Sequence, residues 1–209
     1  EHSAHPPSWE AFSHRYRQHL PTPADFMSQP LNAERLRAVL RRMSSSAAHG
    51  VEGWRVSELR CLPDFLLDRL CDLYRLIETG GTWPSQVTTG LVTMLTKGAG
   101  LGALDLRPIS VVSIVHRLWA AHHVGDIMEW QNQWVSADIF GFRQASECKD
   151  AFYQTALDIE TALLEGRPLC GCSMDFAKAF DLVPREIIFR LADHTGVPQH
   201  VLRPLRGMY

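Results

Sequence analysis

The feature that most constrains this chain is an apolar run, residues 169–174, followed directly by an acid, Asp175. Such a run is typical of a buried strand. Burying an unpaired carboxylate is costly, so an acid here is expected at the exposed end of the strand, beside a cation, a metal ion or a helix N-terminus. We therefore predict a strand over 169–175 that ends at Asp175.

Two further apolar segments, residues 90–97 and 106–110, are separated by a glycine-rich bend. Both have the composition of strands, so the sequence predicts a finger-like hairpin. Lys97 and Arg107 lie at the two lips of the bend, and Asp105 is the one acid near them in the sequence. Paired cations at a flexible bend are suited to clamping a polyphosphate.

Helical periodicity and capping residues predict the secondary structure of most of the remaining chain. Helices are expected over 9–19, 33–44, 63–79, 113–130 and 146–165, with two more starting after the Val-Pro dipeptides at 183–184 and 197–198. Residues 138–143 are expected to be extended. The order of these elements indicates an α+β fold.

The bulk composition narrows the class of protein. A formal net charge of −2 provides no overall cationic field, so any contact with nucleic acid must depend on local positive charge. Five cysteines without zinc-type pairing indicate a reducing, intracellular setting, and the sequence does not determine whether that is the nucleus. No apolar run approaches the roughly 20 residues of a membrane span, so no membrane partner is expected.

Asp175 and Phe180 suggest a metal site. A strand-end carboxylate suits Mg²⁺, which takes one or two carboxylates together with substrate phosphates. Phe180 follows five residues later, after a tight turn, where its ring can pack beside whatever the metal holds. Each residue also has an ordinary interpretation, Asp175 as a turn or capping residue and Phe180 as core. The order of the motifs along the chain favours the site.

Four segments, taken in their order along the chain, resemble successive motifs of the reverse transcriptases of non-LTR retrotransposons and group II introns. They are residues 84–97, the Arg-Pro-Ile-Ser run at 107–110, Gly-Phe-Arg at 141–143 and DFAKAFD at 175–181. The resemblance covers about residues 50–195. It implies a right-hand polymerase fold: a mostly helical fingers subdomain with a β-hairpin, followed by the first palm strand.

The resemblance also implies roles for single residues. Asp175 matches the catalytic, metal-binding aspartate, and Phe176 would lend its backbone carbonyl to the same Mg²⁺. Arg107 and Lys97 match fingers residues that hold the triphosphate of the incoming nucleotide. Phe180 falls at the steric gate, where an aromatic ring excludes a 2′-hydroxyl. The implied partners are an RNA template, a DNA primer and deoxynucleoside triphosphates.

The sequence also departs from the family. Two-metal nucleotidyl transfer uses ions about 3.5 to 4 Å apart, and in the family an Asp-Asp pair on a later hairpin shares them with the first aspartate. This sequence contains no Asp-Asp pair. We therefore expect an incomplete polymerase domain, inactive alone, in which Mg²⁺ binds only once the site is complete. Its expected regions are a lead-in with N-terminal helices (1–48), fingers (49–167) and the start of the palm (168–209).

Two other readings stay open at this point. The chain could be a non-catalytic retroelement remnant that acts as an RNA-binding or interaction module. It could also be an unrelated α+β domain with coincidental motifs. The leading interpretation depends on one geometric condition, that Asp175 and Arg107 face a shared cleft.

Overall fold

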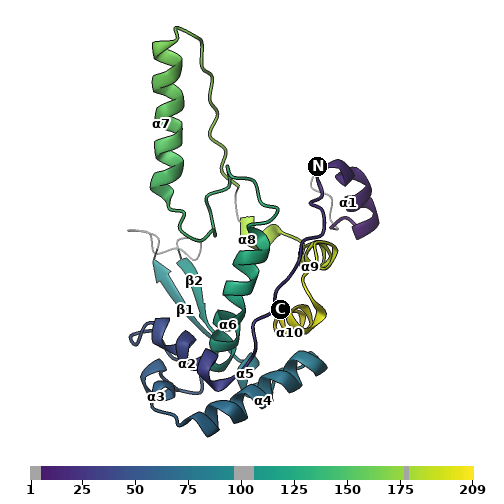
Figure 1. The fold of residues 1–209 in the computed structure, drawn as a ribbon, viewed down its shortest axis with the longest axis vertical. Helices are drawn as coiled ribbons and strands as arrows, with labels where there is room; N and C mark the ends of the chain where they lie inside the picture. Colours follow the sequence, from purple (N-terminus) through teal and green to yellow (C-terminus); the bar gives the residue numbers. More distant parts are fainter. Residues whose placement is uncertain (1–5, 97–105, 177–178) are drawn as a thin grey trace. The chain divides into compact units, whose positions relative to one another are not determined.

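The computed structural model describes residues 6–96, 106–176 and 179–209. These residues are mostly helical, with one two-stranded antiparallel sheet, so the coarse α+β expectation is confirmed (Figure 1). They form two compact units, and each is described by itself. The Asp175 unit consists of described residues within 1–25 and 128–196, and the hairpin unit consists of those within 26–127 and 197–209. The sequence was expected to divide into a lead-in, fingers and the start of a palm. That division into polymerase subdomains stays a prediction.

The hairpin unit is built on three helices whose ends follow local sequence signals. Helix α2 (Ala33–Arg42) begins where the Asn32 side chain accepts a hydrogen bond from the Arg35 amide at 2.9 Å. Helix α4 (Asp64–Gly80) begins after Pro63 and ends at Gly81, which has a φ of 71°. Helix α6 (Ile114–Gln131) begins where the Glu52 carboxylate accepts from the Ile114 amide at 2.6 Å. All three helices were predicted to within two residues.

Shorter elements complete the hairpin unit. They are α3 (Val56–Arg60), α5 (Ser85–Thr88), strands β1 (Leu91–Thr96) and β2 (Leu106–Val111), and α10 (Gln199–Met208). The apolar faces of the helices form one core, with Leu36, Leu67, Ile114, Leu118 and Val201 fully buried. In this core the Trp83 indole donates a hydrogen bond of 2.8 Å to the Pro204 carbonyl, which holds α10 against the unit.

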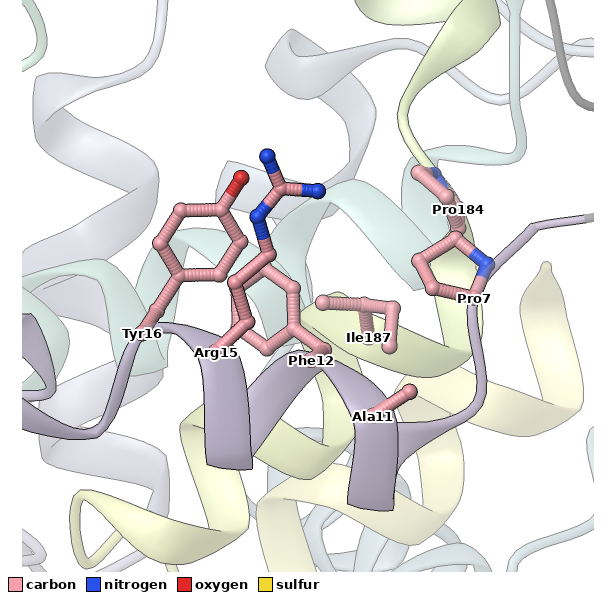
Figure 2. A pocket seen from close by; sticks show the side chains of 7 residues that line it. All are labelled: Pro7, Ala11, Phe12, Arg15, Tyr16, Pro184 and Ile187. Carbon is pink, nitrogen blue, oxygen red and sulfur yellow. The ribbon is translucent and has the colours of Figure 1, made fainter.

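The Asp175 unit contains α1 (Trp9–Arg15), a short 3₁₀ helix (Arg17–His19), α7 (Cys148–Leu164), α8 (Ala179–Leu182) and α9 (Arg185–His194). Helix α9 begins after Pro184, as predicted. The rings of Phe12, on α1, and Tyr16, directly after it, lie 4.9 Å apart, and they line an apolar pocket together with Ile187 of α9 (Figure 2). Arg15 is its one charged lining residue, so the pocket lacks the paired acid and base of a catalytic site.

Two predicted extended segments are wrong. Residues 169–175, expected as the first palm strand, have no regular structure and are exposed. A strand exists only through hydrogen bonds to a neighbour, and no described strand pairs with this segment. Residues 138–143 contain turns at 138 and 141–142 and no strand, and Phe142 has a φ of 57°. No helix among the described residues combines the length and apolar character needed to cross a membrane.

Candidate nucleotide and metal sites

The predicted hairpin is present. Strands β1 and β2 pair antiparallel from Leu91 opposite Val111 to Thr96 opposite Leu106. Arg107 lies opposite Leu95, one pair before the described strands end at Thr96 and Leu106. Lys97 and the rest of the bend lie outside the described residues. The structure therefore confirms the two strands of the finger and places one of its two predicted cations near the far end.

The Arg107 side chain is available to a ligand. It is exposed, and it forms no hydrogen bond or ion pair with any other residue that the structure describes. Other arginines of the same unit are already engaged by the protein. Arg37 donates to Asp64 at 2.9 Å, and Arg60 donates to the Leu40 carbonyl at 2.9 Å. An unpaired guanidinium presents the planar fork of donors that binds phosphate oxygens.

Asp175 and Phe176 lie in the other unit. Both are exposed, Phe176 by 75%, and Asp175 has no ion pair within the described part of the chain. The backbone around Phe180 is helical in α8. A carboxylate and a backbone carbonyl are the hard oxygen ligands that Mg²⁺ prefers, so the donor chemistry fits the predicted role. The shared cleft of Asp175 and Arg107 stays a prediction, since the two residues belong to different units.

No family model and no curated protein matches this chain. The evidence for a function therefore comes from the motifs in the sequence and from the geometry of the side chains.

A second cluster, which the sequence analysis did not identify, lies inside the hairpin unit. His122, His123 and Asp126 of α6 are each at most 3% exposed, and one potential ligand atom from each lies within 4.8 Å of the others. Among residues 6–96, 106–176 and 179–209, no other group of three or more His, Cys, Asp or Glu side chains has this geometry. The available signal was a His-His-x-x-Asp pattern on one turn of α6.

Neighbouring elements hold this cluster in place. One oxygen of Glu78, on α4, lies 3.0 Å from His123 Nε2 and accepts a hydrogen bond from the Trp119 indole at 2.9 Å. Asp126 accepts from the Gln29 amide at 3.1 Å, and its carboxylate lies 3.7 Å from His123 Nδ1. The contacts join α4 and the segment before α2 to one turn of α6.

Burial shifts the pKa values around the cluster. It lowers the pKa of His122 and that of His200, on α10. Burial raises the pKa of Glu78, but the hydrogen bonds from His123 and Trp119 outweigh it, so this pKa lies below its usual value. The result is a buried site in which ionised Glu78 faces neutral His122 and His200 near neutral pH.

His116 lies one and a half turns before this cluster on α6. It is 6% exposed, and neither ring nitrogen has a hydrogen-bond partner among the described residues. Its ring packs against Trp83, with centroids 5.0 Å apart, and against Trp119 at 6.1 Å. Burial lowers the pKa of His116. The His116 ring thus packs among aromatic rings, and the residue lies outside the three-residue cluster.

Proposed function

We propose that this chain is part of an RNA-directed DNA polymerase, a nucleotidyltransferase, and contributes its fingers and the start of its palm. The observation that carries the proposal is the hairpin, which presents Arg107 near the end of its described strands, exposed and with no side-chain partner among the residues that the structure describes. An exposed guanidinium at this position is suited to contacts with the phosphate oxygens of a nucleotide. The motif order described above adds the resemblance to the retroelement reverse transcriptases.

In this proposal each residue has a separate task. Arg107, with Lys97, binds and orients the triphosphate, and so neutralises charge as the pyrophosphate leaves. Asp175 and the Phe176 carbonyl would hold Mg²⁺, and the bound ion would supply Lewis-acid activation of the primer hydroxyl. Phe180 limits the space beside the sugar and selects deoxynucleotides. The sequence contains no Asp-Asp pair, so the proposal assigns that pair to a polypeptide segment outside this sequence.

The first test measures nucleotide binding by the chain itself. We expect a fluorescent deoxynucleoside triphosphate to bind, and Arg107→Ala to weaken binding about tenfold, as expected for one charge-assisted contact. The matched control is Arg69→Ala, because Arg69 is also an exposed arginine of the hairpin unit, 3.2 Å from Asp72. Equal affinities for both variants would remove Arg107 from the site.

The second test measures catalysis in a polypeptide that joins this chain to the Asp-Asp hairpin. With an RNA template, a DNA primer and Mg²⁺, Asp175→Ala should abolish extension, while Asp158→Ala, which changes an exposed acid on α7, should not. Phe180→Ala should raise ribonucleotide incorporation relative to deoxynucleotides by about tenfold or more, about 1.4 kcal/mol of discrimination. Undiminished extension by Asp175→Ala would refute the assignment. RNA binding without nucleotide binding or extension would favour the non-catalytic remnant.

A further inference from the structure

We propose that His122, His123 and Asp126 form a binding site for a divalent transition-metal ion, with Zn²⁺ as the best-suited ion. The site lies in the core of the hairpin unit, and its residues differ from those proposed to bind Mg²⁺. It is independent of the proposed polymerase activity. Binding of the ion would link one turn of α6 to α4 and to the segment before α2, through the contacts that Glu78 and Gln29 make with the cluster.

The first argument is the unused hydrogen-bonding capacity of the histidines. Both ring nitrogens of His122 and Nδ1 of His123 are buried and have no hydrogen-bond partner among the described residues. A buried polar atom without a partner costs about 1–3 kcal/mol, and such atoms are rare in native cores. A metal ion would give the lone pair of one nitrogen on each ring a partner.

The second argument is the orientation of His123. An ionised carboxylate only accepts hydrogen bonds, so the contact with Glu78 requires His123 Nε2 to carry the proton. In the neutral ring, the lone pair is then on Nδ1, the nitrogen nearer Asp126. Metal-binding histidines almost always donate their other N–H to a carboxylate or carbonyl in this way. Glu78 thus acts as a positioning residue for a ligand.

The third argument is the choice of ligands. His122 and Asp126 are four residues apart on one helix, and His123 and Asp126 are three apart, so all three side chains lie on one face. Two imidazoles with one carboxylate are a common zinc set that leaves a fourth position for water. Mg²⁺ prefers oxygen ligands throughout, so it is a poor fit here.

The distances set a condition on binding. Ligand atoms of a tetrahedral zinc site are about 3.4 Å apart, as follows from bonds of about 2.0–2.1 Å. The three atoms here lie within 4.8 Å of one another. Metal binding therefore requires the ligand atoms to move about an ångström closer together than they lie in the structure.

The test uses the whole chain, prepared without a polyhistidine tag and treated with chelator. Zn²⁺ titration by calorimetry should show one tight site, and Co²⁺ should give the visible absorption bands of a tetrahedral site. Saturating Zn²⁺ should raise the unfolding temperature by about 5 °C or more, because the metal binds only the folded state. Absence of a tight site in the wild-type chain would overturn the proposal.

Variants separate this site from surface histidines. Asp126→Asn, which keeps a side-chain oxygen toward the Gln29 amide, should remove tight binding and the Co²⁺ bands. Glu78→Gln should weaken binding by about 10- to 100-fold, as loss of an outer-shell carboxylate does. His116→Gln is the matched control, since it changes a similarly buried histidine of the same helix outside the cluster, and it should bind Zn²⁺ as the wild type does.

Folding of each variant is checked by circular dichroism in the absence of metal. A folded Asp126→Asn chain with wild-type Zn²⁺ affinity would overturn the proposal, because binding would then come from other histidines. Equal loss of binding in His116→Gln would overturn it as well, because the effect would then reflect general destabilisation of α6.

Discussion

His116 shows how a titratable side chain can be buried without an ionic partner. Its ring packs against those of Trp83 and Trp119, and burial away from water disfavours the charged form of the imidazole. Burial thus lowers the pKa of His116 in the folded chain. In the unfolded chain the same group has its ordinary pKa of about 6.5. At a pH between the folded and the unfolded pKa of His116, this side chain is therefore more protonated in the unfolded chain than in the folded chain.

This difference predicts a pH dependence of stability. The contribution of His116 is fully present above the unfolded pKa, and it is lost as the pH falls from about 6.5 toward the lower folded pKa. The free energy of unfolding should therefore be smaller at pH 5.5 than at pH 7.5. His116→Gln should reduce that difference, by at most about 1.4 kcal/mol for each pH unit. Urea unfolding at both pH values measures it, and an unchanged pH dependence in the variant would contradict the assignment.

Helix α4 illustrates how one residue type ends an element. Gly81 has a φ of 71°, a backbone conformation that side chains with a Cβ disfavour, and its amide donates to the Ile77 carbonyl. A Cβ added at Gly81 would also lie 3.1 Å from the Arg203 Cβ of α10. Gly80, one position earlier, is helical, and a Cβ there would meet nothing within 4 Å.

The two glycines therefore predict opposite effects of the same substitution. Gly81→Ala should lower the free energy of unfolding by about 1–2 kcal/mol, because alanine is strained in the left-handed region. Gly80→Ala should leave it unchanged or raise it by up to about 1 kcal/mol, because alanine favours the helix. Chemical unfolding of both variants gives the comparison. The same sign for both would show that the helix does not end at this turn.

Helix α7 and the segment after it show the limits of local pattern. The helix forms as predicted, yet Ala162 is its one buried residue, and Phe152, Leu163 and Leu164 are at least 75% exposed. The following segment, 168–176, is also exposed, and its amides form no backbone hydrogen bond within the described part of the chain. An apolar sequence thus predicts a tendency to be buried, but burial needs a neighbouring element.

Stability across the chain should accordingly be uneven. Amides of 168–176 should exchange with solvent almost as fast as in an unstructured peptide. Those of α4, whose Leu67, Cys71, Tyr74 and Ile77 are buried, should exchange at least about a hundredfold more slowly. Hydrogen exchange followed by mass spectrometry on the intact chain measures both regions together. Strong protection of 168–176 would show that this segment pairs as a strand after all.

The candidate polymerase residues all come from motifs in the sequence. The predicted elements that carry them differ in whether the structure contains them, for a physical reason. The hairpin of Arg107 is confirmed, because its two strands lie close in the chain and pair with each other. The prediction of a strand that ends at Asp175 is wrong. An apolar run forms a strand only when another strand pairs with it, and no described strand pairs with this segment. The roles of Lys97, Arg107, Asp175, Phe176 and Phe180 stay predictions.

The amino-acid order by itself determined the elements whose signals act within one or two turns: the Asn32 cap, the Gly81 stop and the starts of the late helices at Pro184 and Pro198. Tertiary structure alone decided which polar groups became buried together. Glu78 and His123 are 45 positions apart, and no local pattern links them. Burial and pairing depend on contacts between distant residues, because desolvation acts only where packed elements exclude water.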